Sequence, residues 1–168
     1  NPIGFEDMAA LMGLAAEQKY SKSYSAIAKA IRLFCAPEQV QESLAQLFAI
    51  VTLSCIVGNG DAHLKNFGLL YSDPTQRDAR LAPAYDIVNT TAYIPEDVLA
   101  LDLVGNKSLF ASRQGLLDFA QVCDVVRPEE VIRGQLQALE RVLARSTELG
   151  EQAPHVVAAI KHCAGPFV

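Results

Sequence analysis

The sequence predicts a mainly α-helical domain with a small β-hairpin at its functional site. Apolar residues recur at helical spacing through most of the 168 residues, and two short β-type segments lie close together in the middle of the chain. A dense polar stretch, residues 58–66, directly follows the most apolar helical run. A chain of this length can bury one substantial core, so we expect a single domain over residues 1–168.

Six helices are expected, each with an apolar stripe and most with Pro or Gly at a boundary. They lie within residues 1–20, 20–37, 37–58, 113–124, 127–149 and 152–163. The first has Phe5 and Met8 on one face. The third is apolar nearly all round in its second half, which indicates a central helix. We expect it to end at Gly58, because glycine adopts the left-handed conformation that turns a chain off a helix.

Two extended segments follow the polar stretch. Residues 67–71 and 80–83 flank a turn-forming sequence and predict a hairpin, which would carry Asp86 back towards Asp61. Residues 99–103 fit either a strand or a helix, and the glycine that follows them indicates a turn.

Composition argues against two function classes. Acidic residues outnumber basic ones by 19 to 14, giving a formal net charge of −5. Direct nucleic-acid binding is therefore not expected, because it depends on clustered Lys and Arg. The longest apolar stretch, 44–58, is interrupted by polar residues and is short for a membrane span, and no signal peptide is visible. We expect a cytoplasmic protein without membrane contact.

The four cysteines are far apart and lack Cys-x-x-Cys spacing, so we expect reduced thiols rather than a disulfide framework. His162 and Cys163 are adjacent, but no second ligand pair lies near them in the sequence. A zinc site is therefore not expected.

The polar stretch carries the candidate chemistry. It reads Gly58-Asn59-Gly60-Asp61-Ala62-His63-Leu64-Lys65-Asn66, which places an acid, an imidazole, an ammonium and an amide within six residues. Asp61 and Asn66 are five positions apart, the Asp-x-x-x-x-Asn interval of kinase catalytic loops, and Asp86 follows in an apolar setting. Asp, Asn and Asp in this order predict phosphoryl transfer.

Phosphoryl transfer requires an oriented hydroxyl and neutralised triphosphate charge. We expect Asp61 to accept or align the hydroxyl proton, and Asn66 and Asp86 to offer hard oxygen ligands to Mg²⁺. His63 and Lys65, on one side of an extended loop, would face the phosphates of ATP. The residues expected to shape the loop are Gly58, Asn59 and Gly60.

This motif, followed by Leu81-Ala82-Pro83-Ala84-Tyr85-Asp86-Ile87-Val88-Asn89-Thr90, resembles the HipA-like serine/threonine kinase family, best known as toxins of bacterial toxin-antitoxin modules. The resemblance covers nearly the whole chain. It implies a protein-kinase-like C-terminal lobe, similar also to that of phosphoinositide kinases, with a catalytic loop at 58–66 and a metal-binding segment at 81–90.

In that family the catalytic aspartate matches Asp61, the metal-binding positions match Asn66 and Asp86, and His63 and Lys65 match the Asp-x-His-x-Lys-Asn pattern. The resemblance implies transfer of the γ-phosphate of Mg-ATP to a protein hydroxyl. It also implies a helix-turn-helix antitoxin repressor as a candidate partner.

Two departures from the family pattern are visible. Gly60 stands where Ser or Thr is usual, which removes a hydroxyl and loosens the backbone. No phosphate-binding loop or ATP-binding lysine is recognisable before residue 58, so the N-terminal ATP-binding lobe is expected to be absent. The isolated chain is then expected to be inactive and to bind Mg-ATP weakly.

Three alternatives stay open. The order Asp-x-His-x-x-Asn is shared with phosphoinositide kinases, which leaves a lipid or small-molecule kinase. A non-enzymatic kinase-like module that binds a regulatory partner is the second. A metal-dependent hydrolase using Asp61, His63 and Asp86 is the third, and it needs a further ligand that the loop does not offer.

Overall fold

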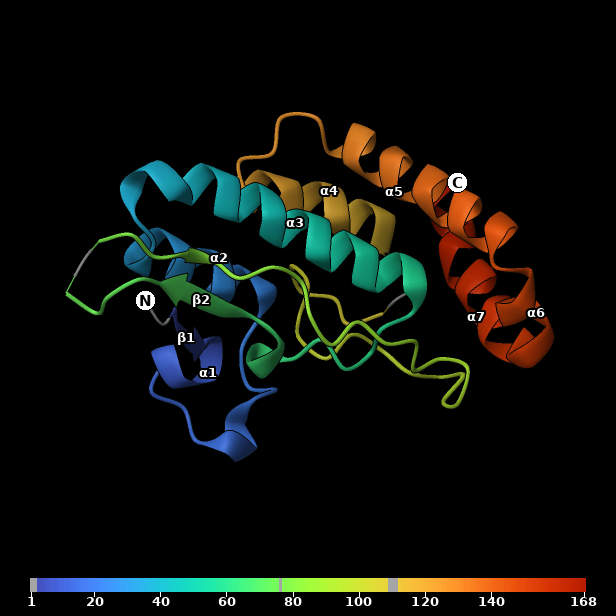
Figure 1. Ribbon diagram of the computed structural model, residues 1–168, viewed down its shortest axis with the longest axis horizontal. Coiled ribbons are helices and arrows are strands. Elements are labelled where there is room, and N and C mark those ends of the chain that lie inside the picture. Colours follow the sequence, from blue (N-terminus) through green and yellow to red (C-terminus); the bar gives the residue numbers. More distant parts are fainter. Residues whose placement is uncertain (1–2, 76, 109–111) are drawn as a thin grey trace.

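The computed structural model describes residues 3–75, 77–108 and 112–168, and shows a mostly helical domain with one small sheet (Figure 1). The mainly helical class is as predicted. The sheet, however, has three antiparallel strands rather than the two of the expected hairpin. Short 3-10 turns cover Ala16–Gln18, Pro37–Gln39, Leu64–Asn66 and Gly165–Phe167.

Helix α3 (Val40–Val57) is the centre of the domain (Figure 1). It packs against α2 (Tyr24–Phe34), α4 (Ser112–Val122), α5 (Pro128–Arg145) and α7 (Pro154–Ala164). Because neighbours surround it, its second half is buried nearly all round, as its apolar sequence predicts. It ends at Gly58, whose φ of 72° is the left-handed conformation expected there.

By length and composition alone, Pro37–Val57 could cross a membrane, with 21 residues and a mean hydropathy of 1.6. The sequence argument from length considered only the apolar run 44–58, and the helical segment that contains this run is longer. In this fold 56% of the most apolar window is buried inside the domain, so the helix has the burial of a core helix.

Strands β1 (Gly4–Asp7), β2 (Gly68–Tyr71) and β3 (Arg80–Leu81) form the sheet in that order. The β2–β3 pairing confirms the predicted hairpin. Strand β1 corrects the expectation that Phe5 lies in the first helix. Gly4 pairs with Tyr71, and the backbone hydrogen bonds of β1 therefore depend on a strand far along the chain, which local periodicity does not reveal. Helix α1 is only Met8–Leu11.

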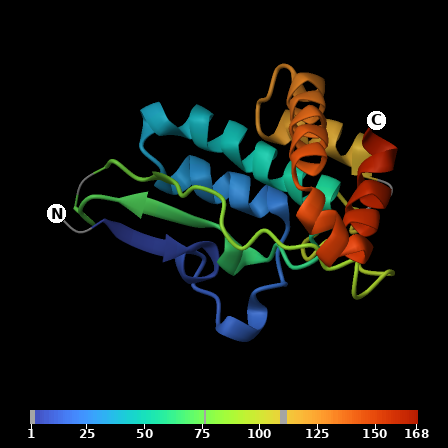
Figure 2. The same cartoon turned by 45° about the vertical axis from the view of Figure 1, so that its right-hand side comes forward.

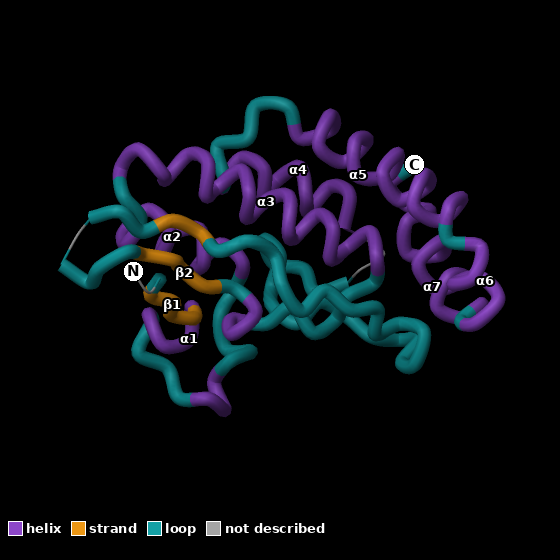
Figure 3. The backbone as a smooth tube through the Cα atoms, viewed as in Figure 1, coloured by secondary structure: helices purple, strands orange, loops and turns teal. Residues whose placement is uncertain are grey.

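Residues 82–108 run between β3 and α4 largely as loop (Figure 3). The ambiguous segment 99–103 is neither helix nor regular strand, and it makes isolated bridges only, including Ser23 with Asp102. Its alternate leucines are buried, which explains the strand-like pattern: Leu99, Leu101 and Leu103. The turn that follows has Gly105 at a φ of 86°, as its sequence predicts.

The C-terminal helices lie at the opposite end of the domain from the sheet (Figure 2). The single helix expected over 127–149 is divided into α5 and α6 (Thr147–Gln152), because Ser146 leaves the helical conformation with φ −102° and ψ 56°. Helix α7 begins at Pro154, since proline suits a first helical position. All four cysteines are buried, and no disulfide joins them in the described part of the chain.

Candidate active site

The loop 58–66 is held firmly at the end of α3. The Asn59 N–H donates to Ser54 O at 2.8 Å, and the fully buried Asn59 side chain accepts from the Asp61 N–H through Oδ1 at 3.0 Å. A Cβ at position 58 would come within 2.7 Å of both Thr91 Oγ1 and Cys163 Sγ. The start of the loop is thus fixed by backbone conformation, by a buried amide and by lack of space.

Gly60 connects the loop to the segment that follows β3. Its N–H donates to Thr90 Oγ1 at 2.8 Å, and the Thr90 hydroxyl in turn donates to Gly58 O at 3.2 Å. A Cβ at position 60 would overlap the carboxylate of Asp97. The space that a side chain at position 60 would fill is therefore occupied by Asp97, which comes from another part of the chain.

Asp61 is half exposed and is oriented by an aromatic hydroxyl. The Tyr20 hydroxyl donates to Asp61 Oδ1 at 2.7 Å, and His63 Nε2 lies 3.9 Å from the same oxygen. Burial and this hydrogen bond raise the pKa of Tyr20, which keeps the hydroxyl protonated as a donor. No hydrogen bond from the described residues reaches Oδ2, so that oxygen can accept a further hydrogen bond.

His63 is buried and Lys65 is exposed, so they do not share one side of an extended loop as the sequence predicts. The reason is the 3-10 turn Leu64–Asn66, which rotates successive side chains to different sides. Burial, reinforced by the nearby Lys19 ammonium, lowers the pKa of His63, so its imidazole is neutral at neutral pH. Its Nδ1 has no hydrogen-bond partner among the described residues.

Asn66 and Asp86 meet as the hairpin returns the chain to the loop. Asn66 Nδ2 donates to Asp86 Oδ2 at 2.8 Å. The buried Asn66 Oδ1 has no donor among the described residues. Asp86 has a φ of 55°, a left-handed conformation that is uncommon for a residue with a side chain. An orphaned amide oxygen and an exposed carboxylate thus lie together, and the charges of Asp86 and Asp61 both act on His63.

Comparison with known proteins gives this arrangement a family. The family model described as the HipA-like C-terminal domain matches residues 1–155. The chain belongs to the HipA-like C-terminal domain family.

Curated relatives of this HipA-like domain include "Putative kinase Y4dM" of Sinorhizobium fredii, 35% identical over 65% of this chain and 26% of the relative. "Putative kinase Y4mE" of the same organism is 26% identical over 86% of this chain and 36% of the relative. A "Putative kinase" of Haemophilus influenzae is 33% identical over 56% of this chain. The chain thus spans roughly a quarter to a third of the curated relatives it matches.

Among solved structures, the HipA-like domain matches a chain of the Shewanella oneidensis MR-1 HipA, HipB and operator DNA complex, with a TM-score of 0.62 and 17% identity. The match covers 97% of this chain and 42% of that one. At this identity the likeness concerns the fold.

Several site residues of the HipA-like domain escaped sequence reasoning as functional candidates. Tyr20 and Asp97 are 41 and 36 positions from Asp61, and nothing in local spacing connects them to it. Thr90 had a weak signal, because it belongs to the polar sequence Asn89-Thr90-Thr91 shortly after Asp86. Long-range contacts of this kind need the tertiary structure.

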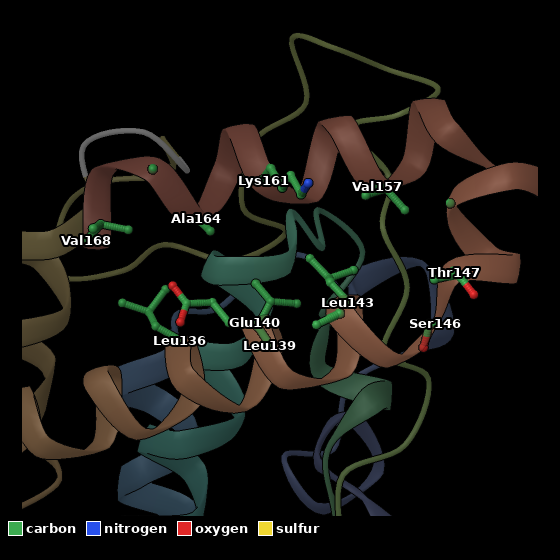
Figure 4. Close-up of a pocket in the computed structure, with 13 residues that line it drawn as sticks. Leu136, Leu139, Glu140, Leu143, Ser146, Thr147, Val157, Lys161, Ala164 and Val168 are labelled. Carbon is green, nitrogen blue, oxygen red and sulfur yellow. The ribbon is translucent and has the colours of Figure 1, made fainter.

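Two cavities of similar size are candidates for the functional site. One, of about 490 Å³, contains Tyr20, Asp61, Asp97 and Lys107 in its lining. The other, of about 520 Å³, is an apolar groove between α5 and α7, lined by leucines such as Leu136 and Leu139 (Figure 4). None of the loop residues 58–66 lines the groove, so we place the chemistry at the first cavity.

Proposed function

We propose that the chain is the catalytic C-terminal lobe of a serine/threonine kinase, which transfers the γ-phosphoryl group of Mg-ATP to a protein hydroxyl. The observation that carries the proposal is the hydrogen bond between Asn66 and Asp86, which joins the loop that also holds Asp61 to the segment after β3. Membership of the HipA-like family, with relatives named as kinases, supports the same conclusion.

The side chains present fit a magnesium ion. Mg²⁺ prefers carboxylate, amide and phosphate oxygens, and Asn66 Oδ1 is a buried amide oxygen without a donor next to the Asp86 carboxylate. Asn66 and Asp86 would hold the ion, which neutralises charge on the phosphates when bound. The described residues contain no group of three or more His, Cys, Asp or Glu arranged to hold a metal, which favours this site over the hydrolase alternative.

Asp61 would align the acceptor. The Tyr20 hydroxyl occupies Oδ1 and orients the carboxylate so that Oδ2 can accept the proton of an incoming hydroxyl. As the acceptor oxygen bonds to the γ-phosphorus, the bond from that phosphorus to ADP breaks and the proton passes to Asp61. The neutral His63 can offer a hydrogen bond rather than a charge, and the exposed Lys65 ammonium can approach phosphate.

The remaining parts of this proposal concern the longer protein. The relatives are much longer than the matched region, which leaves room for the separate N-terminal lobe that would complete the nucleotide pocket. The solved neighbour is a toxin-antitoxin complex with HipB and operator DNA, which supports a cytoplasmic toxin held by a helix-turn-helix antitoxin repressor. In that arrangement the repressor, and not this acidic domain, would contact the DNA.

The decisive experiment is transfer of labelled γ-phosphate from Mg-ATP, including autophosphorylation, by the full-length protein that contains this chain. Asp61→Ala should abolish labelling, and Asp118→Ala, an acid on α4 that lines neither the loop nor the cavity, should leave it unchanged. Absence of labelling in a folded wild-type protein would instead support a partner-binding module without turnover.

A further inference from the structure

The cavity beside Asp61 has the position of an acceptor site. We call it the acceptor pocket and define it by Tyr20, Asp61, Val88, Ile94, Asp97 and Val98. Its volume of about 490 Å³ suits a few side chains of a bound segment. Because Asp61 lies in its wall, whatever fills the pocket is adjacent to the carboxylate proposed to align the hydroxyl.

One side of the acceptor pocket is aliphatic and faces solvent. Val88, Ile94 and Val98 are 42%, 57% and 45% exposed. Covering such a cluster with the apolar surface of a partner lowers the free energy of the complex. Its backbone is already ordered, because the Ile94 N–H donates to Thr90 O at 2.9 Å and the Thr90 N–H donates to Gly58 O at 3.0 Å. The aliphatic surface is therefore attached to the catalytic loop itself.

The lining also includes a carboxylate without a counter-ion. Asp97 lies against Gly60, in space that a side chain at position 60 would fill. Its Oδ1 accepts from the Val98 N–H at 3.0 Å, and no ion pair involves Asp97 in the part of the chain that the structure describes. Lys107, also in the lining, makes no ion pair there with either acid. A half-buried carboxylate of this kind attracts a cationic side chain.

We infer that the acceptor pocket binds an extended protein segment in which the phosphorylated Ser or Thr neighbours both a Lys or Arg, paired with Asp97, and an aliphatic residue, packed on Val88, Ile94 and Val98. This inference rests on the proposed kinase function and specifies its substrate class. The occupant is a peptide segment because a hydroxyl, a cation and an aliphatic group must all reach one pocket together. Asp97 is then a specificity determinant for the acceptor.

The first test measures binding without chemistry. Fluorescence anisotropy on the full-length protein would measure the Kd of two peptides. The first contains the sequence Leu-Arg-Ala-Leu, in which Ala replaces the acceptor Ser, and the second has Glu in place of Arg. We expect the Arg peptide to bind about tenfold more tightly, as one charge-assisted hydrogen bond would give. Asp97→Asn keeps an oxygen for the Val98 N–H and should remove that preference, whereas Asp97→Lys should favour the Glu peptide.

Glu96→Gln is the matched control, since Glu96 is exposed and does not line the pocket. It should leave the preference intact. Replacement of the peptide's leucines by Asn should weaken binding several-fold in every variant. Equal binding of the Arg and Glu peptides by the wild-type protein, or an unchanged preference in Asp97→Asn, would overturn the inference.

The second test measures phosphorylation of the same peptides with Ser restored. We expect kcat/KM to favour the Arg peptide about tenfold and Asp97→Asn to reduce this ratio to near one. Asp61-dependent labelling without any preference would reject the acceptor inference and leave the kinase function standing. Selective binding in the first test without labelling in this one would reject the kinase function and leave a peptide-binding pocket.

Discussion

At the scale of single residues, the orientation of Asp61 is the feature on which the proposed chemistry depends most. Asp61 is on a loop and half exposed, so without a partner its carboxylate would sample several rotamers. Tyr20 limits this freedom through one hydrogen bond, and Asn59 fixes the backbone beneath it. One carboxylate oxygen is thereby occupied, and in the proposed mechanism the other would accept the substrate proton.

We predict that Tyr20→Phe lowers kcat by roughly tenfold, because it removes one hydrogen bond that orients a charged group. The affinity for the nucleotide should change little. Steady-state kinetics of the full-length protein would measure both quantities. Tyr93→Phe is the control, because Tyr93 is 73% exposed and its ring packs against His155 rather than Asp61. A kcat within about twofold of wild type would remove Tyr20 from the proposed mechanism.

A second residue-scale prediction concerns pH. Burial raises the pKa of the Cys123 thiol from 9.0 to about 12, so the folded state resists ionisation there. The unfolded chain loses this proton as the pH rises above about 9, and the folded state does not, so the free energy of unfolding decreases between about pH 9 and pH 12. Buried Tyr24 acts in the same direction.

Urea unfolding of the wild type and Cys123→Ala near pH 8 and near pH 10.5 would measure this dependence. We expect the wild type to lose on the order of 1 kcal/mol more than the variant over that range. Equal losses in the two proteins would show that Cys123 does not contribute.

At the scale of elements, the junction between α3 and the loop decides the position of the site. Helix α3 is buried and rigid, and the turn at Gly58 directs the chain off it towards Asp61. The same turn packs against Thr91 and Cys163, so it also joins the loop to the segment after β3 and to α7.

We predict that Gly58→Ala lowers the free energy of unfolding by about 2–4 kcal/mol, from left-handed strain together with the clashes of the new Cβ. Gly105→Ala is the matched comparison, because Gly105 also has a positive φ but no atom within 4 Å of a new Cβ. It should cost only about 1 kcal/mol. Chemical denaturation would measure both, and equal losses would show that space at position 58 is unimportant.

At the scale of the whole molecule, the proposed site has contributions from the loop 58–66 and from the segment after β3. In the proposed kinase, Lys65 and Asn66 would face the nucleotide from the loop and Asp86 would face it from the segment after β3. The chain covers 42% of its solved structural neighbour. Under this proposal, enclosure of ATP would depend on residues beyond this domain.

We predict that residues 1–168 alone bind Mg-ATP with a Kd of about 1 mM or weaker, because half of the usual contacts are missing. Isothermal titration calorimetry would measure it, with circular dichroism to establish that the domain is folded. The full-length protein should bind substantially more tightly. Micromolar binding by the isolated domain would show that it contains a complete nucleotide pocket.

Much of the fold was accessible from the sequence because it depends on local signals. The helical spacing of α2 and α3, the left-handed Gly58 and the β2–β3 hairpin were all predicted, since each is specified by residues close together in the chain. Strand β1 was not, because its partner lies more than 60 residues away. The division of α5 from α6 at Ser146 was also missed.

For the site, the sequence by itself determined the identity and order of Asp61, Asn66 and Asp86, together with the glycine that turns the chain off α3, because motif spacing and backbone conformation are local properties. Only the tertiary structure decided that Asn66 contacts Asp86, that His63 is buried while Lys65 is exposed, and that Tyr20 and Asp97 lie beside the loop. These features arise from packing between segments distant in sequence, and no local pattern encodes which distant side chain fills a given space.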